Sequence, residues 1–229
     1  MIAELGQQDL DPSRWGYKAA RLSRAAGLGF LVPPGICLCS EILGAPHSEQ
    51  SLSAWLHIYR PDLVALRSSS PREDLLDKSN TGSSVSIIGC PPIARTIIRR
   101  IHSEILSQAK DQDDSASDIA VIVQQQVGSG YSGVAFYSDG ALVAEFSYNA
   151  PGAVTSGLEP HTHVHVTRSV ASATGRPAPT RAITDALIRA CRRLRESFGF
   201  DIDLEWVWDR GALFVLQVRP VTRRLGSDR

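Results

Sequence analysis

The chain has no excess charge of either sign and no long apolar run. Its 24 basic and 24 acidic residues give a formal net charge of zero over 229 residues. The basic surplus that draws proteins to nucleic acid or to anionic lipid is therefore missing. No stretch reaches the roughly 18 apolar residues of a membrane-spanning helix. We therefore expect neither a nucleic-acid partner nor a membrane partner.

Cysteine is also scarce, and its spacing is uninformative for metal chemistry. The four cysteines form no Cys-x-x-Cys pair, and Cys37 and Cys39 lie in an apolar run typical of a strand. We interpret all four as buried thiols of a reducing compartment, with a metal or redox site as the alternative. The first ten residues are polar and show no signal-peptide pattern, so a cytoplasmic protein is expected.

The remaining composition is that of an ordinary globular protein with 43% hydrophobic and 21% charged residues. Helical periodicity over residues 17–26 and 180–198, with strand-like segments between them, predicts a mixed α and β chain. Isoleucines one turn apart predict a further helix after Pro91 and Pro92; they are Ile93, Ile97, Ile101 and Ile105. The polar stretch 110–118 is typical of a linker. We therefore expect an N-terminal lobe over 1–110 and a C-terminal lobe over 119–222.

The final strand pair, residues 203–206 and 216–220, carries the most informative pattern. Side chains alternate along a strand, so Glu205, Gln217 and Arg219 share a face only if the connecting loop keeps an even register. Carboxylate and amide oxygens beside a fixed guanidinium suit Mg²⁺ and a bound polyphosphate. A solvated strand face is the alternative.

The register of this pair depends on the turn at residues 209–211. We expect a three-residue loop that closes with Gly211 in a left-handed conformation. Glu205 would then lie opposite Val215, with Gln217 on the diagonal and within side-chain reach.

A second polar stretch follows an apolar run that ends at Arg67. Three serines, Ser68 to Ser70, follow directly, and the polar segment continues through Gly82 to Ser86. Small hydroxyls and glycine let backbone N–H groups approach phosphate oxygens, and a guanidinium can bind the same group with two hydrogen bonds. An ordinary polar loop between strands is the alternative.

Five motifs follow one another along nearly the whole chain. The first is Gly-x-Lys-x-x-x-Leu at residues 16–22, followed by Val-Pro-Pro-Gly at 32–35. The second is the arginine–serine loop at 66–74, with Gly82 fifteen residues after the arginine. The last three are Val-Ile-Val-Gln at 121–124, Ser-Gly-Val-Ala-Phe at 132–136, and the strands Leu-Glu-Trp at 204–206 and Leu-Gln-Val-Arg-Pro at 216–220.

This ordered series resembles the nucleotide-binding domain of the phosphoenolpyruvate synthase and pyruvate phosphate dikinase family, which rifampin phosphotransferases share. The resemblance implies an α+β, two-lobed ATP-grasp fold that binds ATP with Mg²⁺ between its lobes. It implies phosphate contacts for Lys18 and Arg67, with Gly82 and Ser86 closing over the phosphates. It also implies that Gln124 begins a hinge whose backbone binds the adenine edge.

For the final strand pair, the resemblance implies that Glu205 and Gln217 bind Mg²⁺ and that Arg219 holds the γ-phosphate. Lys18, Arg67 and Arg219 would be the catalytic groups. Such a site acts through positioning and charge neutralisation rather than through a protein nucleophile.

The chain departs from the family pattern in three places. Residues 148–154 lack the acidic residue of the family's Gly-Leu-Gly-Glu segment, although Glu145 and Glu159 flank this stretch. Asn80 and Thr81 replace a Phe and an Ala. The sequence also stops after its Gln-x-Arg-Pro strand, so we expect neither the swivelling domain with its phosphorylated histidine nor the phosphoenolpyruvate/pyruvate barrel.

Three histidines, His161, His163 and His165, alternate along the sequence. On a strand they would share one face. This spacing is compatible with a Zn²⁺ site, with a substrate or nucleotide contact, or with a polar strand face.

We therefore expect an ATP- and Mg²⁺-dependent phosphotransferase domain. Its acceptor would be a histidine on a separate polypeptide or a small molecule. Three other functions stay open: an ATP-grasp carboxylate–amine ligase, a nucleotide-binding regulatory subunit without turnover, and a degenerate scaffold that binds no nucleotide. ADP release that depends on a carboxylate and an amine would indicate the ligase, whereas AMP with two transferred phosphates would indicate a dikinase.

Overall fold

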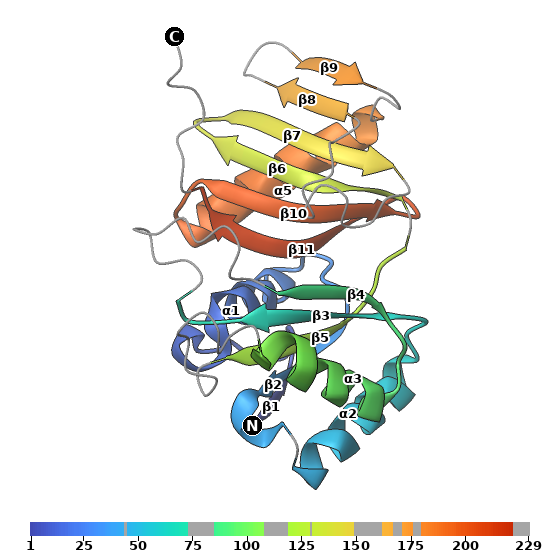
Figure 1. The fold of residues 1–229 in the computed structure, drawn as a ribbon. Helices are drawn as coiled ribbons and strands as arrows, with labels where there is room; N and C mark the ends of the chain where they lie inside the picture. Colours follow the sequence, from blue (N-terminus) through green and yellow to red (C-terminus); the bar gives the residue numbers. More distant parts are fainter. Residues whose placement is uncertain are drawn as a thin grey trace. The chain divides into compact units, whose positions relative to one another are not determined.

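The computed structural model describes residues 1–43, 45–72, 85–107, 119–128, 130–148 and 180–221, together with the backbone of strands 162–166 and 171–175. The chain forms two compact units (Figure 1). Unit 1 comprises Met1–Gly29 and Pro33–Gln126, and unit 2 comprises Phe30–Val32 and Val127–Arg229. Each unit is built on one antiparallel sheet, which confirms the α+β class.

The sheet of unit 1 has the strand order β1-β2-β5-β3-β4. Its strands are β1 (Ile2–Glu4), β2 (Gly35–Cys39), β3 (Val64–Ser69), β4 (Ser86–Cys90) and β5 (Ala120–Gln125). Its helical segments are α1 (Pro12–Gly27), η1 (Ser40–Ile42), α2 (Pro46–Tyr59), α3 (Ala94–Arg100) and η2 (Ile101–Leu106). Helix α1 begins where Asp11 accepts a hydrogen bond from Ser13 N at 2.9 Å, with Pro12 in the first turn.

One face of this sheet packs against α2 and α3. Leu66 of β3 and Val123 of β5 are fully buried there with Trp55 of α2. Of the four isoleucines expected along one stripe, Ile97, Ile101 and Ile105 are fully buried, whereas Ile93 is 56% exposed. The helix begins at Ala94, so Ile93 precedes its first turn and the prediction was wrong at this position.

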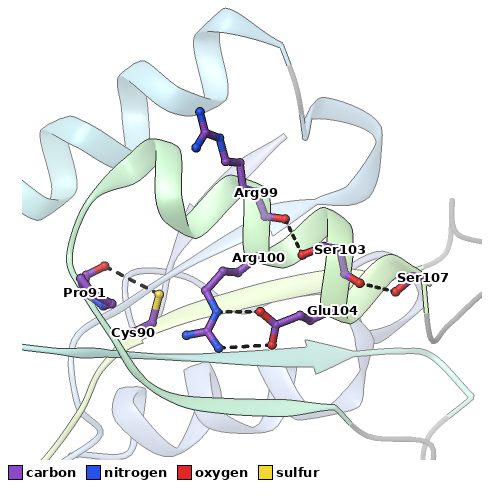
Figure 2. A network of polar contacts seen from close by, with 7 residues as sticks. All are labelled: Cys90, Pro91, Arg99, Arg100, Ser103, Glu104 and Ser107. Atoms are coloured by element: carbon purple, nitrogen blue, oxygen red, sulfur yellow. Dashed lines mark hydrogen bonds and ion pairs between the residues drawn. The ribbon is translucent and has the colours of Figure 1, made fainter.

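Polar contacts join successive turns of α3 and η2, as Figure 2 shows. Arg100 and Glu104 form an ion pair with Nε–Oε1 and Nη2–Oε2 distances of 2.7 and 3.2 Å. The Ser103 hydroxyl donates to the carbonyl of Arg99 at 3.0 Å. Segment η2 has π-helical hydrogen bonding, so these contacts lie where the helix changes from an α-helical to a π-helical backbone ladder.

The sheet of unit 2 has the strand order β11-β10-β6-β7-β8-β9. Its strands are β6 (Tyr131–Ser138), β7 (Ala141–Tyr148), β8 (Thr162–Val166), β9 (Ala171–Gly175), β10 (Ile202–Asp209) and β11 (Ala212–Pro220). Helix α5 (Arg181–Phe198) crosses one face of this sheet (Figure 1) and buries a stripe of apolar side chains, among them Ile183, Leu187 and Leu194. The opposite face, which carries Glu205, is the more polar one.

A glycine in the middle strand lets two aromatic rings meet. Gly133 lies between Trp206 on β10 and Phe146 on β7, and a Cβ at Gly133 would be 2.0 Å from the Glu145 carbonyl oxygen. The rings of Trp206 and Phe146 therefore approach to 5.7 Å between centroids across the strand that separates them.

The division between the units differs from the boundary expected from composition. Strand β5 pairs with both β2 and β3, so it belongs to unit 1 and the division follows Gln126. Residues 108–118, which contain most of the expected linker, lie outside the described residues. All four cysteines are buried and free, as expected. No helix in the described part of the chain is long and apolar enough to cross a membrane.

Candidate functional site

Helix α1 bends sharply at Gly16, two residues before the first candidate residue, Lys18. Gly16 has φ 74° and ψ 160°, a conformation that L-residues with a side chain rarely adopt. A Cβ at this position would be 2.4 Å from both the carbonyl carbon and Oγ of Ser69. The backbone conformation and the close approach of α1 to β3 thus both require glycine.

Three successive residues after the bend donate hydrogen bonds to three successive serines. The pairs are Tyr17 N to the Ser70 carbonyl at 3.3 Å, Lys18 Nζ to the Ser68 carbonyl at 2.9 Å, and Ala19 N to Ser69 Oγ at 3.0 Å. These contacts bury Lys18, which is only 3% exposed. Its ammonium therefore lies at the residue that directly follows Arg67.

The three serines bond to the backbone of the protein itself. Ser68 Oγ accepts from Val85 N at 2.9 Å, and Ser70 Oγ accepts from Arg72 N at 3.1 Å. Ser69 Oγ, besides accepting from Ala19, donates to the carbonyl of Trp15 at 2.7 Å. Sequence reasoning treated these hydroxyls as small groups around a phosphate and missed their structural bonds.

Three other candidates of unit 1, Arg67, Ser86 and Gln124, lie on the same face of the sheet as Ser69. Arg67 is paired with Ser86 on β4, so their side chains are cross-strand neighbours. Gln124 lies opposite Ala65, two residues along β3 from Arg67, and so shares this face. Arg67 is largely buried, whereas Ser86 is exposed. Gly82, the remaining candidate of unit 1, lies outside the described residues.

Gln124 connects two segments of unit 1. Its Nε2 donates to the Pro33 carbonyl at 3.1 Å, and the N–H of Gln125 donates to Pro34 at 2.8 Å. The side-chain amide therefore ties the Pro-Pro segment to β5. A hinge role for the backbone that follows Gln124 stays a prediction, and the division between the units falls two residues later.

The hairpin of β10 and β11 places Glu205 and Gln217 on one face, as expected, but with a different loop and a different register. Asp209 pairs with Ala212, so the loop has two residues, Arg210 and Gly211, with φ 48° and 82°. Two positive φ values are typical of a type I′ hairpin turn, which replaces the expected three-residue loop.

A bulge then corrects the register. The pairing shifts between Glu205 and Trp206, and Leu216 is the extra residue on β11. Glu205 therefore lies directly opposite Gln217, where the expectation had Val215 opposite and Gln217 on the diagonal. Without the bulge, Gln217 would lie on the other face of the sheet.

Arg219 lies between two carboxylates on this face. Its Nε is 3.4 Å from Asp203 Oδ2, and its Nη2 is 3.5 Å from Glu205 Oε1. The side chains of Glu205 and Arg219 are 13% and 34% exposed, and Gln217 is buried. Asp203 was missed as a site residue, although its position two residues before Glu205 places it on the same strand face.

The polar face continues towards the strands that carry the histidines. Glu205 is paired with Val134, Val134 with Glu145, and Glu145 with His163. His163 and His165 lie in β8, but only their backbone is described, and His161 and Glu159 lie outside the described residues. Within the described part of the chain, no group of three or more His, Cys, Asp or Glu residues could hold a metal ion.

Solved structures identify the class of fold. The chain superposes on dinucleotide forming acetyl-coenzyme A synthetase 1 from Ca. Korarchaeum cryptofilum with a TM-score of 0.55 and 17% identity, covering 88% of this chain and 90% of that one. D-alanine–D-alanine ligase from Helicobacter pylori gives 0.51 and 11% identity, covering 92% of this chain and 54% of that one. D-alanyl-alanine synthetase A from Vibrio cholerae also gives 0.51 and 11%, covering 95% and 57%. The chain has the ATP-grasp fold that the motifs predicted.

A more particular relation comes from sequence. No family model matches the chain. The chain is distantly related to the prodigiosin synthesizing transferase PigC of Serratia marcescens, at 23% identity over 294 residues. The alignment covers 97% of this chain and 33% of PigC, so the chain spans about a third of the length of that relative.

Proposed function

We propose that this chain is an ATP-grasp domain that binds Mg·ATP and transfers a phosphoryl group from it. The observation that carries the proposal is the Glu205–Gln217 pair, with Arg219 beside it on the same strand face. A carboxylate and an amide oxygen at one rung are oxygen donors of the kind that Mg²⁺ prefers.

Glu205 and Gln217 supply too few ligands for a metal ion that is bound by protein groups alone, but enough for Mg²⁺ bound together with a nucleotide. Mg²⁺ usually keeps several waters and takes phosphate oxygens from its nucleotide, so two protein ligands are enough. Glu205 and Gln217 would hold the ion, and the ion would neutralise charge on the nucleotide phosphates. Arg219 would contact the γ-phosphate and would leave its partial pairing with Glu205 when phosphate binds.

We propose the candidates of unit 1 as further contacts for ATP. Lys18 and Arg67 would contact phosphate oxygens, Arg67 with two parallel hydrogen bonds and Lys18 as a point charge. Gly82 and Ser86 would cover the phosphates, and the backbone after Gln124 would meet the adenine edge. The pairing of Arg67 with Ser86 supports this reading, because it puts a cation and a hydroxyl side by side.

The acceptor in this proposal is a histidine on a separate polypeptide or a small molecule. The distant relation to PigC, a transferase by name, favours group transfer. Product analysis tests the reaction type. The chain would be incubated with Mg·ATP and candidate acceptors, and the nucleotide products separated. ADP indicates transfer of one phosphoryl group, AMP indicates the dikinase type, and unchanged ATP with every acceptor would count against turnover.

Carboxylate–amine ligation is the second candidate. Two of the superposed structures are, by name, a D-alanine–D-alanine ligase and a D-alanyl-alanine synthetase. ADP release that appears only when a carboxylate and an amine are both supplied would favour this candidate. Binding of Mg·ATP without any product would favour a regulatory subunit instead.

A further inference from the structure

The bend at Gly16 interrupts one particular backbone hydrogen bond of α1. In an uninterrupted α-helix, the N–H of residue 19 donates to the carbonyl of residue 15. Here the Ser69 hydroxyl stands between these groups, accepting from Ala19 N at 3.0 Å and donating to the Trp15 carbonyl at 2.7 Å. A side chain from β3 has thus been inserted into the hydrogen-bond ladder of α1 at its kink.

Lys18 lies closest to this insertion among the candidate site residues. It lies inside the bridged turn, between the bend at Gly16 and the bonded amide of Ala19. The amide of Tyr17 on its other side is held by the Ser70 carbonyl. The backbone on both sides of Lys18 is therefore fixed to the end of β3, and its ammonium reaches the Ser68 carbonyl at 2.9 Å.

We propose that Ser69 is a positioning residue for Lys18. By bridging the bend of α1, its hydroxyl sets the direction in which Lys18 leaves the helix and so places the ammonium at the Ser68 carbonyl. The inference rests on the proposed function, because it assumes that Lys18 contacts the phosphates of ATP. Ser69 touches no nucleotide in this account and acts only through Lys18.

Serine suits this position on two physical grounds. Its hydroxyl both donates and accepts, which one group must do to join a carbonyl and an amide. Its small volume suits a fully buried site in which a Cβ on Gly16 would come within 2.4 Å of the hydroxyl oxygen. Alanine would leave the Trp15 carbonyl and the Ala19 amide without the hydroxyl that joins them.

The same helix offers a matched control. Ser23 is also buried, accepts from Gly6 N at 2.9 Å and donates to the Gln8 carbonyl at 2.7 Å. Its hydroxyl thus makes the same two kinds of bond, at nearly the same lengths, to a segment that follows β1. Ser23→Ala and Ser69→Ala remove equivalent pairs of hydrogen bonds. Only the pair made by Ser69 includes the residue next to Lys18, Ala19.

The experiment compares both variants with the unaltered chain by melting temperature and by the Kd for Mg·ATP. We expect similar losses of melting temperature. Ser69→Ala should raise the Kd by about tenfold, equivalent to ~1.4 kcal/mol, whereas Ser23→Ala should change it by less than about twofold. Lys18→Met should raise the Kd strongly in the unaltered chain but little in the Ser69→Ala variant. Both substitutions would remove the same contact between Lys18 and the phosphates, so their effects should not add.

A measurement on the unaltered chain covers the case in which Ser69→Ala does not fold. Mg·ATP should slow amide hydrogen exchange at Ala19, whose N–H is bonded to Ser69, more than at Gly6, whose N–H is bonded to Ser23. Equal slowing at both amides, equal Kd values for the two serine variants, or additive effects of Lys18→Met would overturn the positioning role alone. No Mg·ATP binding by the unaltered chain would overturn the proposed function and this inference with it.

Discussion

The two units hold their candidate cations in different ways. In unit 1, Lys18 is buried and its ammonium lies at a backbone carbonyl, at a bend fixed by a glycine and small hydroxyls. In unit 2, Arg219 is about one-third exposed and lies between two carboxylates on a strand face. The first arrangement depends on shape and the second on charge. Changes of side-chain volume should therefore disrupt unit 1, and changes of charge or Mg²⁺ concentration should disrupt unit 2.

The largest effect on stability should come from volume added at the bend. Gly16→Ala places a Cβ 2.4 Å from the Ser69 backbone and 2.5 Å from Ser70 N, at a positive φ. Neither backbone can move aside cheaply, so we expect the free energy of unfolding to fall by about 4 kcal/mol. Urea denaturation followed by circular dichroism measures this change.

Gly27, in the last turn of the same helix, provides the control. Apart from its chain neighbours and the adjacent backbone of its own helix, no described atom lies within 4 Å of a Cβ there, so Gly27→Ala should be neutral or stabilising by up to about 1 kcal/mol. Equal effects of the two substitutions would remove the steric argument for the bend.

The next largest effect should be a loss of turnover when the buried guanidinium of Arg67 is removed. Arg67→Ala should lower kcat by at least about a hundredfold, since one charge-stabilising contact can contribute ~3 kcal/mol to the transition state. Arg67→Lys should recover only part of this loss, because an ammonium cannot bind two phosphate oxygens in parallel. Steady-state kinetics on folded variants provides the comparison. Full turnover by Arg67→Ala would contradict the assignment of this strand end to phosphate binding.

In unit 2 the expected change lies in the Mg²⁺ dependence. Glu205→Gln and Gln217→Ala should each raise the Mg²⁺ concentration for half-maximal turnover by about tenfold, because each removes a proposed ligand. Nucleotide binding without metal should change less. Asp209→Asn, on the same strand but at the hairpin end, is the control and should leave the Mg²⁺ dependence unchanged. An unchanged Mg²⁺ titration in both site variants would remove them from the metal site.

The smallest effect is a pH-dependent one in unit 2. A hydrogen bond from the Ser138 hydroxyl at 2.6 Å, and secondarily the Arg195 guanidinium at 2.7 Å, lower the pKa of Asp201 below its ordinary value. A lowered folded-state pKa stabilises the fold above the pKa of the unfolded chain, and this stabilisation is lost as the pH falls through the folded-state value. Asp201→Asn should therefore cost about 0.5–1 kcal/mol at neutral pH, a modest figure because the carboxylate is one-third exposed.

Chemical denaturation at neutral and acid pH tests this dependence. The difference between Asp201→Asn and the unaltered chain should disappear once the carboxylate is protonated in both states. Asp185→Asn serves as the control, because its partner Arg181 is 94% exposed and 3.6 Å away, and it should have no measurable effect at either pH. A difference for Asp201→Asn that persists in acid would mean that its charge is not the cause.

The sequence predicted the fold through ordered motifs and predicted the shared face of Glu205 and Gln217 through strand alternation. It did not predict how that face arises. Arg210 adopts a left-handed conformation, which is uncommon for arginine and was not expected from the sequence. The residues around Leu216 likewise contain no sequence pattern that predicts a bulge. The two errors in register compensated, because a shorter loop and one extra strand residue leave both side chains on the same face.

The missed features of unit 1 have a different physical reason. Ser69 and Ala19 are 50 residues apart in the chain, so no local pattern reveals the hydroxyl inserted at the bend. Gly16 was noted only as part of a motif, although its positive φ is what admits Ser69. Likewise, β5 looked like the start of a second lobe because its partners in the sheet lie far away in sequence.

The proposed function requires that this chain bind ATP with magnesium, with Glu205 and Gln217 as the metal ligands. Calorimetric titration of ATP into the full chain, with and without Mg²⁺, tests it most directly. We expect saturable binding that is tighter with Mg²⁺, accompanied by a higher melting temperature, because a ligand that binds only the folded state stabilises it. In the Glu205→Gln variant the same tightening should require about tenfold more Mg²⁺. No heat of binding and no thermal shift at millimolar Mg·ATP, with well-folded protein, would contradict the account.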